Sequence, residues 1–350
     1  MTLSVCMIVK NEAAKLKLTL PQLVKHAAEV IVVDTGSTDD TVVVAKELGA
    51  RVEHFKWVDD FSAARNYSLS FATEPWIAWL DADEYLQEED LAKLIAALKS
   101  AAPDARAFDL VMTEAPFGET VRGRSYPRMK IFRNGLGIHF DRPINEQTVD
   151  AEGRIIDGQA LPIVIYHWGR NLESGEMKVK RERYLRLYNN HLQTNPDDPY
   201  VNYLLGNLLK ESGCAAEALD AFSRAAENGQ QDRQVKILAL TGKTEAEFKL
   251  GKLKEAFQTA LQIRELDSSN PASINIIATI LIAAGQIAPA IQGLEELLTS
   301  RQAGIDPVRE QIMPRVILAD AYRKLGQTEK AGAYEAEAEQ LKEKYNAGTK

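Results

Sequence analysis

The sequence predicts an α/β domain with a mixed, mostly parallel sheet, followed by an all-α domain of helical repeats. In the first half, short apolar runs alternate with helical patterns, which is the βαβ rhythm of a mostly parallel sheet. In the second half, a glycine followed five residues later by an alanine recurs at intervals of 38, 34 and 41 residues. Such a period indicates stacked helix pairs. The length of 350 residues allows two domains.

The N-terminal elements follow one another as strand, helix, strand, helix and strand. We expect strands at 3–9, 29–34 and 51–55 and helices at 12–27 and 38–48. Sheets of this kind bind their ligands beyond the carboxyl ends of the strands. The polar residues that follow the apolar runs are therefore the first candidates for a site. They are Lys10, Asn11 and Glu12, then Asp34, Thr35, Gly36 and Ser37, and then Asp81, Ala82, Asp83 and Glu84.

The composition changes near residues 171–180, because all four tryptophans come earlier and Ala, Leu, Glu and Lys dominate afterwards. We place the α/β domain at 1–175, a linking helix at 176–198 and the repeats at 199–350. Each unit has the pattern of two amphipathic helices joined at the glycine, with a small alanine where they cross, and so resembles the tetratricopeptide repeat. The pairs are Gly213 with Ala218, Gly251 with Ala256, Gly285 with Ala290, and Gly326 with Ala331.

Charge and cysteine content restrict the partners and the compartment. The formal net charge is −8, so no basic field attracts nucleic acid or an anionic membrane. Cys6 and Cys214 suggest neither a disulfide framework nor a zinc site. We find no signal-peptide pattern and no run near the ~18 apolar residues of a membrane span. We therefore expect a cytoplasmic protein without nucleic acid or a membrane span, and a homodimer stays open.

Three carboxylates lie within residues 79–84, directly after an apolar run. At a corner between a strand and a turn, Asp81 and Asp83 can converge on one divalent cation, and oxygen ligands select hard ions such as Mg²⁺ or Mn²⁺. The alternative is an acidic turn before the helix that begins near Glu88, since acids are favoured at helix starts. The spacing alone leaves both interpretations open.

Four motifs in this order resemble the nucleotide-binding half of the family 2 glycosyltransferases with the GT-A fold. They are SVCMIVKNE, VIVVDTGSTDDT, WVDDFSAARNYSL and EPWIAWLDADE, and the resemblance is dense over 1–90 and thinner to about 170. It implies that Asp83 is a metal ligand, that Asp81 faces the ribose or the metal, and that the cofactor is Mn²⁺ or Mg²⁺. It also implies a nucleotide-sugar donor, with a UDP-sugar favoured. The implied donor-binding residues are Lys10, Asn11, Glu12, Asp34, Thr35, Arg65, Asn66, Asp81 and Ala82.

Some residues of these motifs have simpler explanations. Thr35 stands where many relatives have a second acid, which leaves base selection open. A tight turn explains Gly36 and Ser37. We expect Asp59 and Asp60 in a solvated loop and a helix cap.

The segment 124–147 resembles the acceptor side of the same family. Where Ile-His-Glu is common, this chain has Asn145 before Glu146, so a role that needs imidazole is lost. An inverting transfer needs a carboxylate that takes the acceptor proton. We expect Glu146 to be this base and hold Asp141 in reserve. The alternative is a salt bridge of Glu146 with Arg142 or Arg128.

His167 ends a later apolar run and corresponds to the family's late histidine. By the resemblance it binds the metal or the diphosphate, whereas an isolated histidine on an apolar strand is usually a core residue. His139 is interpreted as structural. Arg128, Lys130 and Arg133 either neutralise the leaving diphosphate or are simply solvated.

The resemblance implies a metal-dependent inverting transferase that moves a sugar from a nucleoside diphosphate to a peptide, protein or glycan acceptor recruited by the repeats. Fusion of such a domain to tetratricopeptide repeats is a familiar arrangement in enzymes that glycosylate peptides. The alternative is an inactive, transferase-like scaffold whose repeats bind a protein partner. Intact Asp81, Asp83, Arg65 and His167 favour the enzyme. A nucleotidyltransferase would carry a Gly-rich basic loop after the first strand, and KNEAAKLKL is not one.

Overall fold

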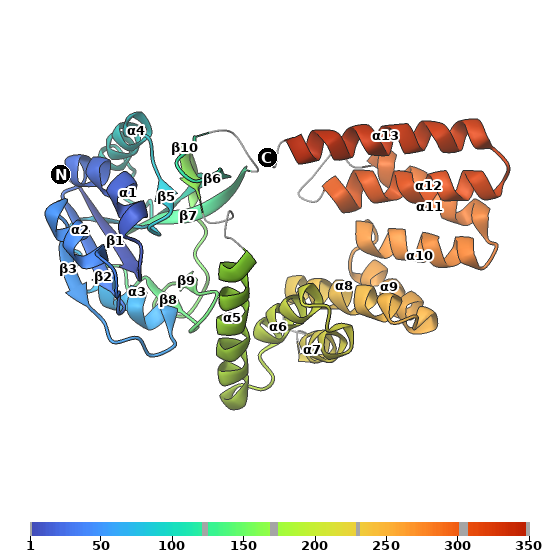
Figure 1. Ribbon diagram of the computed structural model, residues 1–350, viewed down its shortest axis with the longest axis horizontal. Coiled ribbons are helices and arrows are strands. Elements are labelled where there is room, and N and C mark those ends of the chain that lie inside the picture. The colour runs from blue at the N-terminus through green and yellow to red at the C-terminus, as the bar shows by residue number, and fades with distance from the viewer. Residues whose placement is uncertain (1, 121–124, 169–173, 229–231, 301–306, 348–350) are drawn as a thin grey trace. The chain divides into compact units, whose positions relative to one another are not determined.

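The structure is a computed structural model that describes residues 2–120, 125–168, 174–228, 232–300 and 307–347. It divides into two compact units, residues 1–177 and 178–349. The first contains a mixed sheet with helices, and the second is helical (Figure 1). The predicted fold class is thereby confirmed. Helix α5, Ser174–Thr194, runs across the division.

An eight-stranded sheet forms the centre of the first unit, in the order β3-β2-β1-β4-β7-β6-β10-β5. Strands β1, β2, β3 and β4 are parallel, whereas β7 runs antiparallel to both β4 and β6. Strands β8 and β9 form a separate pair. The bounds are β1 Leu3–Val9, β2 Glu29–Asp34, β3 Arg51–His54, β4 Trp76–Trp79, β5 Glu84–Tyr85, β6 Ala107–Glu114, β7 Ser125–Arg133, β8 His139–Asp141, β9 Gln147–Val149 and β10 Gln159–His167.

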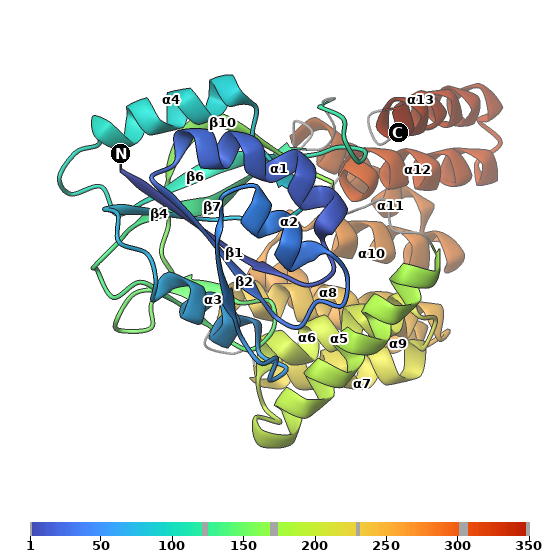
Figure 2. The ribbon, with the colours of Figure 1, turned by 60° about the vertical axis from the view of Figure 1, so that its left-hand side comes forward.

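Helices cover the two faces of this sheet with separate apolar clusters. On one face lies helix α1 (Figure 2), and its Leu16, Leu20 and Leu23 belong to a buried apolar cluster that also contains side chains of β1. On the other face, Trp79 and Phe140 belong to a cluster that also contains Cys6, Ile31 and Val33, and α3 packs beside it. The helices are α1 Ala13–His26, α2 Thr41–Glu47, α3 Phe61–Leu69 and α4 Glu88–Lys99.

Helix α2 begins at Thr41 instead of the predicted residue 38. The backbone N–H of Thr38 donates to Asn11 Oδ1 at 2.8 Å, and that of Thr41 donates to Asp39 Oδ1 at 3.0 Å. Side chains of the loops at the end of the sheet thus hold the backbone of residues 38–40 in a non-helical conformation. The helix therefore begins at Thr41, after this segment.

The second unit contains four helix pairs in its described residues. The first helix of each pair ends two residues before one of the predicted glycines, whose φ values are 83°, 74°, 77° and 75°. This left-handed conformation favours glycine. The pairs are α6 Pro199–Glu211 with α7 Ala215–Asn228, α8 Arg233–Lys249 with α9 Leu253–Leu266, α10 Pro271–Ala283 with α11 Ile287–Ser300, and α12 Met313–Lys324 with α13 Thr328–Ala347. A π-helix, Val308–Ile312, precedes α12.

Close packing explains the small residues of the repeats. The four predicted alanines are all buried. The ring of Phe222 in α7 lies against two helical glycines, because a Cβ on Gly206 would come 2.6 Å from it and a Cβ on Gly242 would come 2.4 Å from it. One aromatic side chain thus joins α6, α7 and α8. None of the described helices combines the length and the apolar character that a bilayer crossing requires.

Two helical glycines of the repeats should respond oppositely to alanine. Gly242→Ala adds a methyl group against the buried Phe222 ring, so we expect a loss of about 1–2 kcal/mol of unfolding free energy. At Gly293 an added Cβ meets nothing within 4 Å, so Gly293→Ala should gain up to about 1 kcal/mol from helix propensity. Urea unfolding followed by circular dichroism measures both. Equal effects of the two substitutions would contradict the packing of Phe222.

Candidate active site

Asp34 ends β2 and fixes the turn that follows. Its carboxylate accepts the backbone N–H groups of Gly36 and Ser37, each at 3.1 Å, and Gly36 has a φ of 105°. His54 Nδ1 lies 3.5 Å from Asp34 Oδ2. The carboxylate is buried and points toward the backbone of its own turn, which accounts for the glycine and the serine.

The loops after β1 and β2 form one wall at the carboxyl end of the sheet. Asn11, in a left-handed conformation with φ 57°, donates its backbone N–H to Ser37 Oγ at 2.9 Å. Glu12 donates its N–H to Thr41 Oγ1 at 2.7 Å. The Thr35 hydroxyl donates to the Val9 carbonyl at 3.0 Å and is buried. Thr35 therefore ties the two strands together through its side chain, while Lys10 is exposed beside them.

Asp81 and Glu84 close the turn that follows β4. Glu84 donates its backbone N–H to the Asp81 carbonyl at 3.0 Å, and Glu84 Oε2 accepts the N–H of Asp81 at 3.0 Å. Lys130 Nζ of β7 donates to both Glu84 oxygens at 2.6 and 2.8 Å. Both side chains of this pair are buried, at 3% and 1% exposure. The predicted acidic turn is therefore anchored from within the sheet.

Burial and the neighbouring charges shift the pKa values of the ionisable groups at this turn in opposite directions. Burial raises the pKa of Glu84 and lowers the pKa of Lys130, and each partner opposes the shift of the other. Burial would also raise the pKa of Asp81, but the charges of Arg65 and Lys130 hold it well below its usual range. Asp81 is therefore an anion at neutral pH.

Arg65 of α3 joins Asp81 to Glu146. Its NH2 atom lies 2.8 Å from Asp81 Oδ1, and its Nε lies 2.6 Å from Glu146 Oε1. The guanidinium is buried and stacks 4.7 Å from the Trp79 ring centroid. Burial alone would lower the pKa of Arg65, but the two carboxylates raise it. The predicted donor-side and acceptor-side carboxylates are thus held by one cation. Arg65 is a partner of Glu146 that the alternatives from the sequence, Arg142 and Arg128, did not include.

The segment that carries Glu146 has an unusual backbone. Arg142 and Asn145 both have positive φ, at 74° and 50°, which is uncommon outside glycine. The start of α3 holds this segment, because the N–H of Phe61 donates to the Pro143 carbonyl at 2.8 Å and the Ser62 hydroxyl donates to the Arg142 carbonyl. Helix α3 therefore positions Glu146 both through Arg65 and through the backbone.

Asn66 and Asp141 have different surroundings. The Asn66 side chain donates to the Phe140 carbonyl and accepts the Phe140 N–H, both at 2.8 Å, so it joins α3 to β8. Asp141 lies exposed at the end of β8. Asp60 caps α3 by accepting the N–H of Ala63 at 2.8 Å, as predicted for a helix cap.

Asp83 and His167 come together on the other side of the turn. His167 Nε2 lies 3.9 Å from Asp83 Oδ1, and Lys15 Nζ lies 3.8 Å from Asp83 Oδ2. His167 pairs with Glu84 across β10 and β5, while Lys15 also contacts Glu12 at 2.8 Å. Burial raises the pKa of Glu12, Lys15 opposes this shift, and the charges of Asp83 and Asp81 add to it.

This pair fits one divalent cation. Two ligands of one ion at ~2.1 Å lie roughly 3–4 Å apart, which is the separation of His167 Nε2 from Asp83 Oδ1. The other ring nitrogen, Nδ1, is buried without a hydrogen-bond partner. Among the described residues, no three acidic, histidine or cysteine side chains gather closely enough to hold a metal alone. A bound ion would therefore need ligands from another molecule, such as a diphosphate.

Sequence reasoning gave no role to Trp79 or Lys15 in this site. It expected Lys130 to neutralise the leaving diphosphate or to be solvated, whereas Lys130 is buried and paired with Glu84. The signal for Lys130 was a lysine within the otherwise apolar run MKIF of a buried strand. His139 makes only a contact with the Gly137 carbonyl, at 3.0 Å from Nδ1. Arg133 donates to the Ala105 carbonyl and stacks on Trp76, away from the turn.

Comparisons with known proteins show what the two parts of the chain are similar to. Residues 4–150 match the family model Glycosyl transferase family 2. A TPR repeat-containing protein of Synechococcus elongatus is 34% identical over 270 residues, which are 74% of this chain and 66% of the relative. The SPbeta prophage-derived glycosyltransferase SunS of Bacillus subtilis is 27% identical over 230 residues, which are 65% of this chain and 54% of the relative. The chain thus spans about two thirds and about half of the length of these relatives.

Among solved structures, the chain is similar to glucosyl-3-phosphoglycerate synthase from Mycobacterium tuberculosis in complex with Mn²⁺, uridine diphosphate and glucosyl-3-phosphoglycerate. The identity is 23%, the likeness covers 32% of this chain and 44% of that chain, and the TM-score is 0.29. A TM-score this low adds nothing to the assignment of the fold.

The buried pair of Glu84 and Lys130 should be sensitive to the loss of one partner. Lys130→Met leaves Glu84 buried without a cation, so we expect a loss of about 3–5 kcal/mol of unfolding free energy at neutral pH. The double variant Glu84→Gln with Lys130→Met should recover most of it. Thermal and urea unfolding measure these changes. Lys93→Met is a matched control, because Lys93 is exposed where it pairs with Asp90, so its loss should change the unfolding free energy far less.

The cost of Lys130→Met should also depend on pH. Without its cation, Glu84 has a folded-state pKa raised above the unfolded value, so the stability it contributes is present at low pH and is lost as pH rises through the folded pKa. The variant should therefore lose less unfolding free energy, relative to the wild type, at pH 5 than at pH 8. A pH-independent loss would show that packing, and not the unpaired charge, dominates.

Proposed function

We propose that this chain, in which residues 4–150 form a glycosyl transferase family 2 domain and TPR-like repeats follow, is a metal-dependent inverting glycosyltransferase. Its donor would be a nucleoside-diphosphate sugar, with a UDP-sugar favoured. One observation carries the proposal: Arg65 holds Asp81 and Glu146 together, while Asp83 and His167 meet on the other side of the same turn. A donor side and an acceptor side thus adjoin at the end of one strand.

On the donor side, Asp83 and His167 would hold Mn²⁺ or Mg²⁺, which neutralises diphosphate charge when bound. Lys15, 3.8 Å from Asp83, adds a positive charge. The loops at Asn11 and Asp34 would border the base and ribose, since they form the wall at the ends of β1 and β2. Asp81 would orient the ribose or the metal from its place beside Arg65.

On the acceptor side, Glu146 would take the proton of the acceptor hydroxyl. The acceptor oxygen then forms a bond to the anomeric carbon from the face opposite the diphosphate, and the bond from that carbon to the diphosphate breaks. Arg65 orients Glu146 at 2.6 Å, and the strained backbone at Arg142 and Asn145 fixes the direction of approach. Asp141 is the second candidate for the base.

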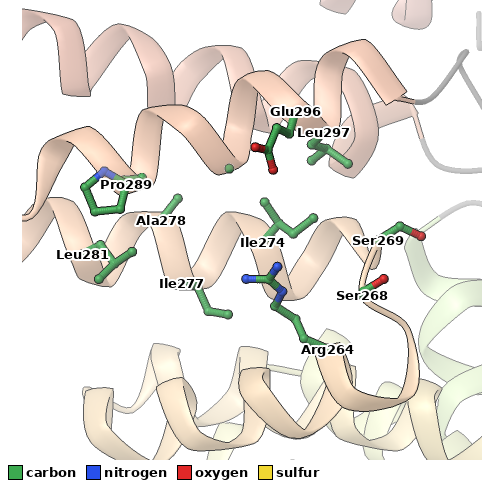
Figure 3. A pocket seen from close by; sticks show the side chains of 12 residues that line it. Arg264, Ser268, Ser269, Ile274, Ile277, Ala278, Leu281, Pro289, Glu296 and Leu297 are labelled. Carbon is green, nitrogen blue, oxygen red and sulfur yellow. The ribbon is translucent and has the colours of Figure 1, made fainter.

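We propose further that the repeats recruit the acceptor, which would be a polypeptide or a glycan. The repeat unit has a pocket of about 340 Å³ between α10 and α11, with Arg264 of α9 reaching toward Ile274 and Ile277 (Figure 3). Apolar walls with a few charged groups suit a polypeptide segment. An inactive scaffold that only binds a partner is less favoured, because the carboxylates of the site are held in a charge network.

The metal proposal predicts a loss of donor binding on removal of its ligand. Asp83→Ala, or a chelator with the wild type, should lower UDP affinity at least ~10-fold with little change in unfolding temperature, because Asp83 lies partly exposed outside the core. Calorimetric titration with UDP and Mn²⁺ measures this. Asp104→Ala, an exposed aspartate in a loop, is the control. Full UDP affinity in the presence of the chelator would refute metal dependence.

The base proposal predicts a different pattern. Glu146→Gln keeps the shape and one hydrogen bond to Arg65 but cannot take a proton, so we expect kcat for transfer to fall ~10²-fold with nearly unchanged donor affinity. Transfer rates and UDP titration, measured in parallel, separate these effects. Lost donor affinity would assign Glu146 to the nucleotide site, and an unchanged rate would transfer the role to Asp141.

A further inference from the structure

Three cations surround the ring of Trp79, and two of them have carboxylate partners. Lys130 Nζ lies 3.5 Å, the Arg65 guanidinium carbon 4.7 Å and the Arg128 guanidinium carbon 5.5 Å from the ring centroid. Lys130 is paired with Glu84, and Arg65 is paired with two carboxylates. Within the described part of the chain, the Arg128 side chain makes no hydrogen bond or ion pair, and it is exposed.

Arg128 lies at the end of β4. Ala78 of β4 pairs with Ile131 of the antiparallel strand β7, and the guanidinium of Arg128 lies beside the ring of Trp79, the last residue of β4. Arg128 therefore contacts an aromatic ring at the end of the strand where the proposed chemistry occurs. Arg133, farther along β7, instead donates a hydrogen bond to the Ala105 carbonyl.

Arg128 shares the indole ring of Trp79 with Arg65, the residue that binds Glu146. The described ion-pair contacts of Asp83 are with Lys15 of α1 and His167 of β10, and Arg128 is not one of them. The charge of Arg128 thus lies close to the arginine that holds the proposed base.

A guanidinium with a fixed plane binds carboxylate and phosphate groups through two parallel hydrogen bonds. The cation–π contact with Trp79 restricts Arg128 before any ligand binds. We propose, on the basis of the function proposed above, that Arg128 binds an anionic group of the acceptor, so that the preferred acceptor is a hydroxyl compound or residue that carries a neighbouring carboxylate or phosphate. Arg128 is then the residue that selects the acceptor by charge.

The proposal predicts a charge preference that depends on Arg128. Transfer from the nucleotide-sugar donor is measured with two matched pairs of surrogate acceptors, glycerate against glycerol and N-acetylserine against its amide. The wild type should prefer the charged member of each pair about tenfold or more in kcat/KM, since hydrogen bonds to charged groups are the strong ones. Arg128→Gln should bring this ratio close to one, Arg128→Lys should restore part of it, and Arg128→Glu should favour the neutral member.

Two further measurements separate this role from others. UDP affinity by calorimetry should be unchanged in Arg128→Gln, and a loss there would assign Arg128 to the leaving diphosphate and overturn the proposal. Arg51→Gln is the matched control, because Arg51 also stacks on an aromatic ring, at 4.6 Å from Phe71, but on the edge strand β3. It should keep the charge preference and the transfer rate of the wild type.

Failure of this inference is distinguishable from failure of the proposed function. If the wild type binds UDP with metal but shows no preference for charged acceptors, including the case of no transfer to either member, the role of Arg128 is refuted while donor binding stands. If the wild type binds no UDP with metal, the proposed function itself fails.

Discussion

The buried ion pair of Glu84 and Lys130 is the interaction on which the geometry of the site depends. The Glu84 carboxylate accepts the backbone N–H of Asp81 and binds Lys130. The backbone N–H of Glu84 donates to the Asp81 carbonyl and so closes the turn. The same residue pairs with His167 in the sheet. A charged pair at 1–3% exposure is costly to desolvate and strongly disfavours any arrangement that separates it. The positions of Asp81, Asp83 and His167 therefore all follow from one buried contact.

Arg65 forms the second fixed point of the site. It is buried against Trp79 and Phe140 and forms ion pairs with both Asp81 and Glu146. The carboxylates of Asp81 and Glu146 repel each other, so a cation between them is required to hold both near one strand end. Side chains held in this way before a ligand binds need little rearrangement during the reaction, which is the condition for electrostatic stabilisation of a transition state.

The repeats are stabilised by a different kind of interaction. Their helices contact neighbours through small residues, and the buried ring of Phe222 fills the space left by Gly206 and Gly242. Each helix pair thus depends mainly on the adjacent pair. Such a unit can vary its surface without disturbing the charge network of the α/β unit.

The sequence by itself determined the fold class, the four glycine-centred helix pairs and the strand ends where the polar residues lie, because these follow from local periodicity and from backbone conformations that favour glycine. It also identified Asp81, Asp83, Arg65, Glu146 and His167 as candidates, through motifs that are each short and contiguous. Only the tertiary structure decided how these residues pair. Arg65 meets Glu146 across 81 positions and Lys130 meets Glu84 across 46, and sequence alternatives such as Arg128 or Arg142 for Glu146 had the same charge. The choice among equal charges is made by distance and burial, which depend on the register of β7 against β4 and on the docking of α3, and no local pattern encodes either.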